Sequence, residues 1–554
     1  MAKRKIALLS NVTADMVAQK LRREYEVYIP DGFDMWISDV LNTASGLYTS
    51  SPEAVIVLLD GTEFRSLRSG EELSGRLSLW QSAINKLTEQ LPDVPVFVST
   101  VDFRESAVRT YSERKYYTEW DNDWYQVLQG IAESRKNFYV LDILKRILDE
   151  GRNNFYSNKM WYMGSMPYSK TGIAAVADEI KMALSAAFGS RKKIIALDLD
   201  NTLWGGVIGE DGVNGIELAE HKEGGRFYDL QLRLLEMQKR GTLLAVNSKN
   251  NPEDAKEAIE KHPSMLLRGD CFVSEKINWN DKASNIKAMS AELNLTEGSF
   301  VFIDDNPVER EVVAGQCPDV LVAEFPEDSS DLIALAEDLY QRQFRSLALT
   351  DEDKAKTQMY QTEAKRKAIQ SSALDLDDYI RVLGMKADIH LMREEEAERV
   401  HQLCNKTNQF NLTTKRYSLK EITDMAADEA VDIFTVSSCD KFGDNGLVGV
   451  LICRRDGDAA DIDTFLMSCR VMGRKLENVL IGCLADHYSG TCGYLTGSFI
   501  PTKKNVPVVS KYDELGFELT ETCEDGGKHY RLSLDSGYPA VESYEEIIFN
   551  GEKK

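Results

Sequence analysis

The sequence has few of the residues on which zinc sites, disulfide frameworks and histidine-based catalysis depend. Its 554 residues include six histidines and nine cysteines, and the first histidine is His221. The cysteines are scattered, with no C-x-x-C pair and no Cys/His cluster at zinc spacing. A structural zinc site and a disulfide-stapled secreted fold are therefore excluded, and we expect free thiols in a reducing compartment.

Long apolar runs are also missing, as is an excess of positive charge. No window holds about 18 uninterrupted apolar residues, and the start, MAKRKIALLSNVTADMV, lacks the apolar core and cleavage site of a signal peptide. The 90 acidic residues outnumber the 66 basic ones, so the formal charge is -24. Overall charge therefore disfavours binding to nucleic acid or to an anionic membrane. We predict a cytoplasmic protein with no nucleic-acid or membrane partner.

What the sequence does contain is a globular composition, with 43% hydrophobic and 28% charged residues. The length predicts three domains, which we place at residues 1–189, 190–348 and 385–554, with a charged helical linker over residues 349–384. We expect an α/β fold class for the whole chain.

The first domain contains four short apolar runs, each ending in a polar turn: KIALLSN, AVIVLLDG, VPVFVST and NFYVLDI. Helical patterns lie between them, over residues 15–23, 70–90 and 171–188. This alternation predicts a doubly wound, flavodoxin-like α/β domain with a parallel sheet. An aromatic stretch over residues 110–125 is interpreted as a packing loop, with a binding loop as the alternative.

The second and third domains differ in pattern. The second alternates apolar runs with helices predicted over residues 225–240, 252–261 and 282–293, which indicates another parallel sheet. The third contains longer runs, such as GLVGVLICRR and AADIDTFLMSC, and helices over residues 394–406 and 475–488. This pattern predicts an α+β domain with a mixed sheet.

Polar side chains stand where the strands of the central domain are predicted to end. They are two aspartate pairs, a hydroxyl and a lysine: Asp198, Asp200, Asp304, Asp305, Ser248 and Lys282. In an open parallel sheet, ligands bind at the carboxyl ends of the strands. Neighbouring carboxylates repel one another unless a cation or a shared proton lies between them, and Mg²⁺ prefers oxygen ligands. The pattern predicts a magnesium site; the alternative is a set of acids that cap turns and helices.

These motifs resemble those of the haloacid dehalogenase (HAD) superfamily. D-L-D-N-T resembles its first motif, Ser248 the second, Lys282 the third and Ile303-Asp304-Asp305 the fourth. The stretches DLDNTLWGGVIGEDG and FIDDNPVERE resemble the FkbH-like subfamily in particular. The resemblance implies a Rossmann-like central HAD domain, an N-terminal SGNH-hydrolase-like domain and a C-terminal acyltransferase-like domain of the GNAT fold.

The resemblance also implies roles for these residues. Asp198 is the expected nucleophile, which forms an aspartyl-phosphate, and Asp200 the acid and then the base. Lys282 neutralises charge on the phosphoaspartate. The expected Mg²⁺ ligands are Asp198, Asp304 and Asp305, together with the main-chain carbonyl of Asp200. The residues assigned to substrate binding or its support are Thr202, Ser248, Asn201 and Asn247.

One position departs from the subfamily pattern. Members that transfer a glyceryl unit often carry cysteine between the two motif-one aspartates, where this sequence has Leu199, and the nearest cysteine is Cys271. This favours plain phosphoryl chemistry over transfer of an acyl group through a thioester. The sequence has no large cap insertion, which allows a bulky or macromolecular substrate.

The outer domains show weaker resemblances. Ser10 and Asn11 stand where an SGNH hydrolase has its nucleophile, but without a histidine base we predict a catalytically silent domain. In the third domain, a turn before the helix resembles the pyrophosphate-binding turn of acyltransferases. The candidate acyl- or pantetheine-binding residues there are Arg470, Gly473, Arg474 and Asn505. The polar stretch TNQFNLTTKRYS is interpreted either as a pocket lining or as a structural turn.

Three functions remain open from the sequence. The leading one is an Mg²⁺-dependent HAD-type phosphatase acting on a phosphorylated small molecule. The second is an FkbH-like transferase that moves a three-carbon acyl group from 1,3-bisphosphoglycerate to an acyl carrier protein. The third is a non-catalytic scaffold that binds a carrier protein.

Overall fold

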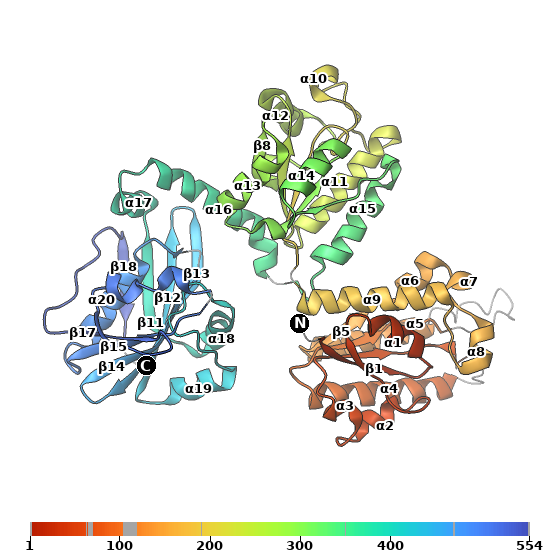
Figure 1. Cartoon of the computed structure of the whole chain (residues 1–554), viewed down its shortest axis with the longest axis horizontal. Helices are drawn as coiled ribbons and strands as arrows, with labels where there is room; N and C mark the ends of the chain where they lie inside the picture. Colours follow the sequence, from red (N-terminus) through yellow and green to blue (C-terminus); the bar gives the residue numbers. More distant parts are fainter. Residues whose placement is uncertain are drawn as a thin grey trace. The chain divides into compact units, whose positions relative to one another are not determined.

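The computed structural model describes residues 3–62, 64, 70–103, 119–189, 191–349, 351–468, 471–502 and 504–551. The chain divides into two compact units, residues 1–361 and 362–554. The first unit contains two five-stranded sheets and the second an eight-stranded sheet (Figure 1). The boundaries expected near residues 189, 348 and 384 stay predictions.

The first sheet has the strand order β2-β1-β3-β4-β5, and all its neighbours are parallel. Its strands are β1 (Lys5–Ser10), β2 (Glu26–Tyr28), β3 (Ala54–Leu58), β4 (Val96–Ser99) and β5 (Phe138–Leu141). The longer helices around it are α1 (Asp15–Leu21), α2 (Trp36–Leu41), α4 (Gly70–Gln90), α5 (Glu119–Ser134), α6 (Ile143–Glu150), α8 (Asn158–Gly164) and α9 (Lys170–Phe188). Two single-turn helices complete the set: α3 (Gly46–Thr49) and α7 (Arg152–Phe155).

Strand β1 shows why this sheet is buried on both faces. Ile6 and Leu8 pack in a cluster with α1 and α9, whereas Ala7 and Leu9 pack in a cluster with α4 and α5. Alternate residues of a strand point to opposite faces, so a sheet covered on both sides needs continuous apolar strands.

The second sheet has the order β10-β9-β6-β7-β8 and is also parallel throughout. Its strands are β6 (Ile194–Leu197), β7 (Leu243–Ser248), β8 (Phe272–Ile277), β9 (Phe300–Ile303) and β10 (Leu321–Val322). Its helices are α10 (Ile208–Asp211), α11 (Gly225–Gln238), α12 (Pro252–Lys261), α13 (Lys282–Leu293), α14 (Pro307–Gln316) and α15 (Leu332–Leu339), followed by the π-helix η7 (Tyr340–Phe344). Helices α11, α12 and α15 share a core with one face of the sheet, and α13 and α14 with the other.

The third sheet is mixed, with the order β16-β17-β15-β14-β13-β12-β11-β18. Its strands are β11 (Lys386–Leu391), β12 (Val431–Asp440), β13 (Gly443–Asp456), β14 (Ala459–Met467), β15 (Tyr494–Phe499), β16 (Glu518–Thr522), β17 (Lys528–Ser533) and β18 (Glu546–Asn550). Helices α17 (Leu376–Leu383) and α20 (Leu476–Tyr488) pack against one face, and α18 (Ala397–Lys406) and α19 (Leu419–Ala427) against the other. The short helix α21 (Lys511–Glu514) precedes β16.

The fold class predicted from the sequence is confirmed, with two parallel α/β sheets and one mixed sheet. Helices α4, α12 and α13 have the predicted bounds. The helix expected from Lys475 begins one residue later, because Lys475 has a φ of 54° and caps α20 instead. Most of the aromatic stretch, residues 110–118, lies outside the described residues. Within the described part of the chain, no helix combines the length and apolar character needed to cross a membrane.

The predicted helical linker forms α16 (Asp351–Ser372), and the boundary between the two units falls within it. In its first half, Lys356 Nζ donates to Gly241 O at 2.9 Å, and Gln361 Nε2 donates to Asp270 O and Phe272 O at 2.7 and 3.1 Å. These bonds attach the first half of α16 to the amino ends of strands in the central sheet.

The second half of α16 joins a buried ion-pair network with the third sheet. Arg366 binds both carboxylate oxygens of Asp440 at 2.7 and 2.9 Å. Arg474, only 2% exposed, pairs with Glu363 at 2.9 Å and lies 3.6 Å from Asp440. Asp440, the fully buried carboxylate of the network, therefore lies between two buried guanidinium groups, and the partly exposed Glu363 pairs with both of them as well.

Replacing Asp440 by alanine should destabilise the second unit strongly, because both arginines would lose the anion between them. A buried ion pair broken on one side costs about 3–5 kcal/mol. Urea unfolding followed by circular dichroism measures the loss. Asp486→Ala, which removes an exposed carboxylate from α20, is the matched control. An equal, small effect of both substitutions would contradict the prediction.

Candidate active site at the carboxyl edge of the central sheet

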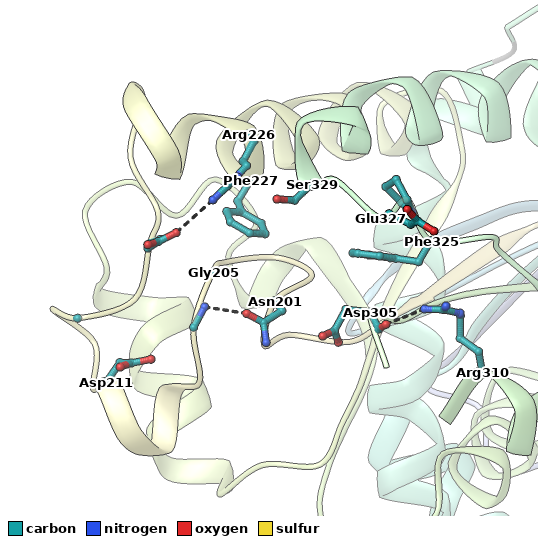
Figure 2. A pocket seen from close by; sticks show the side chains of 14 residues that line it. Asn201, Gly205, Asp211, Arg226, Phe227, Asp305, Arg310, Phe325, Glu327 and Ser329 are labelled. Carbon is teal, nitrogen blue, oxygen red and sulfur yellow. Dashed lines mark hydrogen bonds and ion pairs between the residues drawn. The ribbon is translucent and has the colours of Figure 1, made fainter. Parts of the chain in front are cut away.

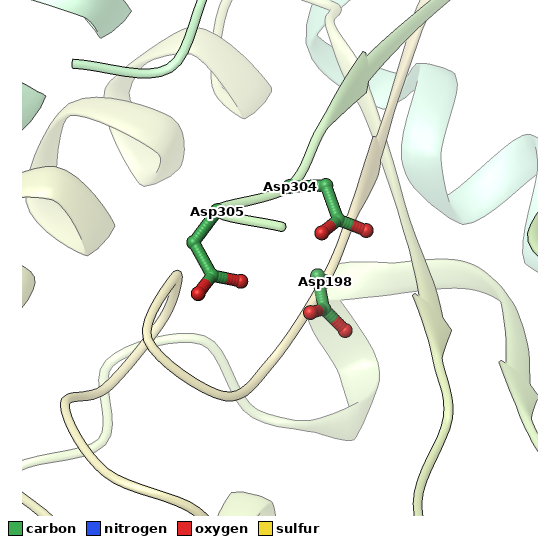
Figure 3. A group of neighbouring side chains, drawn as sticks. All are labelled: Asp198, Asp304 and Asp305. Atoms are coloured by element: carbon green, nitrogen blue, oxygen red, sulfur yellow. The ribbon is translucent and has the colours of Figure 1, made fainter. Parts of the chain in front are cut away.

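Asp198 and Asp304 lie beside one another because they directly follow neighbouring strands. Strands β6 and β9 pair in parallel, and Asp198 N donates to Ile303 O at 3.0 Å. Asp198 is 7% exposed and Asp304 fully buried. Figure 3 shows their side chains next to each other, with Asp305 alongside. One oxygen from each of the three carboxylates lies within 4.8 Å of the others.

Lys282 supplies the positive charge of this cluster. It is the first residue of α13, whose N-cap Asp281 accepts a bond from Ser284 N. Lys282 Nζ lies 2.5 Å from Asp304 Oδ2 and 3.0 Å from Asp198 Oδ1, and its side chain is 3% exposed. Burial lowers the pKa of Lys282, but the two carboxylates outweigh this and raise it overall. The lysine therefore stays protonated at the site.

The carboxylates still exceed the positive charge. Burial, with the charge of Asp198, raises the pKa of Asp304 to about 6 although Lys282 opposes the shift. Burial and Asp198 also raise the pKa of Asp305. Three carboxylates and one ammonium leave a net negative, oxygen-rich group, which a hard divalent cation neutralises. The residues Asp198, Asp304 and Asp305 thus fit Mg²⁺ by charge, donor type and proximity.

The carboxylate of Asp200 does not belong to this group and is hydrogen-bonded to other residues. Its Oδ1 accepts bonds from Trp204 Nε1 at 2.9 Å and Ile208 N at 3.1 Å, and its Oδ2 accepts one from Asn250 Nδ2 at 3.0 Å. Asn201, which follows, has a φ of 53°, and this left-handed residue turns the chain after the strand. Only the main chain of Asp200 is left for the predicted metal contact.

Three other predicted residues of the central domain, Ser248, Asn247 and Thr202, are buried. Ser248 is 1% exposed, and its Oγ accepts a bond from Asn250 Nδ2 at 3.1 Å. Asn247 is fully buried and joins Lys282 O to Asn285, at 3.0 Å each, so it connects the end of β7 to the start of α13. The hydroxyl of Thr202 is buried without a hydrogen-bond partner in the described part of the chain.

Arg310 holds the loop that carries the second aspartate pair. Its Nη1 donates to the carbonyls of Asp304 and Asp305, both at 2.7 Å. Asn306 caps α14 through Val308 N, while its own N–H donates to Asp304 Oδ1 at 2.9 Å. The loop therefore derives its shape from α14, the helix that follows it.

A cavity of about 620 Å³ opens beside Asp305 and Asn201. Figure 2 shows Phe227 and Phe325 with Ser329 between them, and Arg310 bonded toward Asp305. The lining residues are Asn201, Gly205, Gly206, Asp211, Gly215, Glu217, Arg226, Phe227, Asp305, Arg310, Phe325, Pro326, Glu327 and Ser329. Asn201 and Asp305 belong both to the carboxyl edge and to this cavity, so a ligand in the cavity would lie next to the carboxylates.

In the first domain, the predicted polar residues hold strand ends together. Ser10 Oγ donates to Leu58 O at 2.7 Å, and Asn11 exchanges two bonds with the main chain of Asp60, at 2.8 and 2.9 Å. Both side chains therefore connect β1 to β3, which favours the structural role expected for this domain.

The candidate residues of the third domain are largely engaged within the protein. Arg474 belongs to the ion-pair network, and Gly473 has a φ of 74° in the turn before α20. Asn505 is fully buried and donates to Asn411 O and Ile500 O at 3.0 and 2.9 Å. Arg470 lies outside the described residues. The stretch around Asn411 is attached to the sheet, since Leu412 N donates to Phe465 O of β14.

Sequence reasoning missed four residues that build the site: Trp204, Asn250, Asn285 and Arg310. Trp204 and Arg310 stand inside the stretches that carry the HAD resemblance, and Asn250 follows Ser248 by two positions. Their role depends on contacts between loops, which spacing in one sequence does not specify. The signal in the sequence that could have indicated these residues is that they stand close to the motifs.

No protein-family model matches the sequence, and no curated protein matches it significantly. Among solved structures, the chain is similar to the N-terminal part of the protein BF1531 from Bacteroides fragilis, described as containing a phosphatase domain complexed with Mg. The two share 26% identity with a TM-score of 0.57, over 63% of this chain and 95% of that one. A ribosomal-protein-S18-alanine N-acetyltransferase from Escherichia coli matches at 13% identity and a TM-score of 0.22, over 28% of this chain and 97% of that one.

Replacing Arg310 by alanine should weaken Mg²⁺ binding, because two carbonyls of the ligand loop lose their shared donor. Loss of such a supporting contact typically costs about 10–100-fold in metal affinity. Calorimetric titration of Mg²⁺ measures the change. Arg268→Ala is the matched control, since Arg268 also donates to main-chain carbonyls, those of Ile259, Glu260 and His262. The same loss in both variants would show a general effect on folding instead.

Asp60 of the first domain should make stability depend on pH. Burial raises its pKa to about 6. In the unfolded chain the pKa of this carboxyl is about 4, so the unfolded state loses its proton at lower pH than the folded state does. The contribution to stability is therefore fully present below pH 4 and is lost as the pH rises through 6. Wild type should therefore lose up to about 3 kcal/mol relative to Asp60→Asn between pH 4 and pH 7. Calorimetric unfolding at both pH values tests this, with the exposed Asp93→Asn as control; a pH-independent difference for Asp60→Asn would refute it.

Proposed function

We propose that the chain is an Mg²⁺-dependent phosphatase of the HAD type that acts through an aspartyl-phosphate on Asp198. The observation that carries the proposal is the buried cluster of Lys282 with Asp198 and Asp304 at the ends of two adjacent parallel strands, with Asp305 beside them. The likeness to a structure described as a phosphatase domain complexed with Mg supports it.

In the first step, the Asp198 carboxylate attacks phosphorus and the bond from phosphorus to the leaving oxygen breaks. Asp200 gives its proton to that oxygen, so that an alcohol leaves. In the second step, Asp200 takes a proton from water, which attacks the phosphoaspartate and releases phosphate. The two steps restore both carboxyl groups.

The cluster supplies the charge that these steps need. Mg²⁺, when held by Asp198, Asp304 and Asp305, neutralises phosphoryl oxygens so that a carboxylate can approach. Lys282 lies 3.0 Å from the Asp198 oxygen and can neutralise the phosphoaspartate. Ser248 Oγ would bind the phosphoryl group, and the buried Thr202 hydroxyl would support the loop that carries Asp198 and Asp200.

Two features favour hydrolysis over acyl transfer through a thiol. The residue between the motif-one aspartates, Leu199, is fully buried in the core of the central sheet. Cys271 precedes β8 and thus stands at the amino end of that strand, whereas the carboxylates stand at the carboxyl ends. Burial also raises the pKa of the Cys271 thiol, which disfavours the nucleophilic thiolate.

Asp198→Asn should abolish hydrolysis, because an amide is not a competent nucleophile. We expect kcat to fall on the order of 10³-fold or more. Phosphate release from p-nitrophenyl phosphate with Mg²⁺ measures it, and acid-quenched wild type should carry an added phosphoryl mass on the peptide containing Asp198. Asp229→Asn, on the exposed side of α11, is the control. Undiminished hydrolysis by Asp198→Asn would refute the proposal. An acyl increment on an added carrier protein when 1,3-bisphosphoglycerate is supplied would favour the transferase instead.

A further inference from the structure

The carboxylate of Asp200 is held at both oxygens by groups that can only donate. An indole N–H and a main-chain N–H meet Oδ1, and an amide Nδ2 meets Oδ2, all within 2.9–3.1 Å. Two donors on one oxygen and one on the other fix both the position and the rotation of the carboxyl plane. Catalysis by a carboxyl acid requires such a fixed orientation.

The two side chains that provide these donors are themselves buried. Trp204 is fully buried in the core of the central sheet, and its main-chain N–H donates to Leu199 O. Asn250 is 5% exposed and uses the same Nδ2 for Ser248 Oγ at 3.1 Å. Asn250 therefore links Asp200 to the hydroxyl expected to bind the phosphoryl group.

The loop that holds Asp200 also borders the cavity. Gly205 and Gly206, which follow Trp204, line it together with Asn201. A Cβ on Gly205 would come within 2.7 Å of the Phe227 ring, and Gly206 has a φ of 90°, so both positions depend on glycine. The leaving group of a bound ester would thus rest against the loop whose donors orient Asp200.

We infer that Trp204 and Asn250 are positioning residues that aim Asp200 at the leaving oxygen, an inference that rests on the proposed function. When Asp200 gives its proton and the ester bond breaks, the carboxylate left behind meets three donors already in place. Their alignment precedes the reaction, so they stabilise the charge as it develops. An ester whose leaving group is stable as an anion needs no proton in the first step, whereas the second step, in which Asp200 acts as base, is the same for every ester.

A comparison of two esters tests the inference. Ethyl phosphate has a poor leaving group that requires protonation, and p-nitrophenyl phosphate has a good one. Trp204→Phe and Asn250→Ala should each lower kcat/KM, which reports the steps up to departure of the leaving group, for ethyl phosphate relative to p-nitrophenyl phosphate by at least about tenfold, since a positioned acid contributes about 10²–10⁴-fold. Asn251→Ala, which removes an exposed amide bonded to Asp254, and Trp161→Phe in the first domain should leave the ratio unchanged.

The outcomes separate the possible roles. An equal loss on both esters, or no loss on either, overturns the inference, because a merely structural residue acts alike on all substrates. Circular dichroism identifies a variant that fails to fold, and the other variant then decides. If wild type hydrolyses neither ester with Mg²⁺, the proposed function itself fails, which is distinct from an active enzyme with an unchanged ratio.

Discussion

The central domain depends on one buried arrangement, an ammonium group placed between two carboxylates at the edge of a parallel sheet. Taking Lys282, Asp198 and Asp304 out of water is costly, and such groups are tolerated only where they compensate one another. The compensation is incomplete, because Asp305 adds a third carboxylate to the group. The surrounding structure, from the cap of α13 to the bonds of Arg310, keeps these charges together despite their repulsion.

The supporting contacts divide into two sets with different tasks. Asn247, Asn285 and Arg310 fix main-chain segments, so they determine where strands and helices present their ends. Trp204 and Asn250 instead bind a single side chain, the carboxylate of Asp200, which is not part of the group formed by Asp198, Asp304 and Asp305. Two aspartates separated by only one residue can thereby have different neighbours and different chemistry.

The sequence predicted the parallel sheets well, because continuous apolar runs such as that of β1 are required where both faces are buried. It also placed Asp198, Asp304 and Lys282 at one edge, since parallel strands bring their carboxyl ends together. It did not reveal that the carboxylate of Asp200 is bonded to Trp204 and Asn250 and lies outside the group of three carboxylates, because the donors come from a turn and from another loop. The engagement of Arg474 and Asn505 was likewise hidden, since their partners Glu363 and Asn411 stand far away in the sequence.

The position of the unit boundary inside α16 has a practical consequence for dissecting the chain. A fragment ending at residue 348, where a sequence pattern suggests that the central domain stops, would lack Lys356 and Gln361. The carbonyls of Gly241, Asp270 and Phe272 would then lose their donors at the amino ends of the central strands. Conversely, a fragment beginning at residue 385 would lack Arg366 and Glu363 and leave Asp440 and Arg474 buried with fewer counter-charges. Each half of this helix is thus an integral part of the unit it contacts, and a workable excision has to cut within the helix instead of on either side of it.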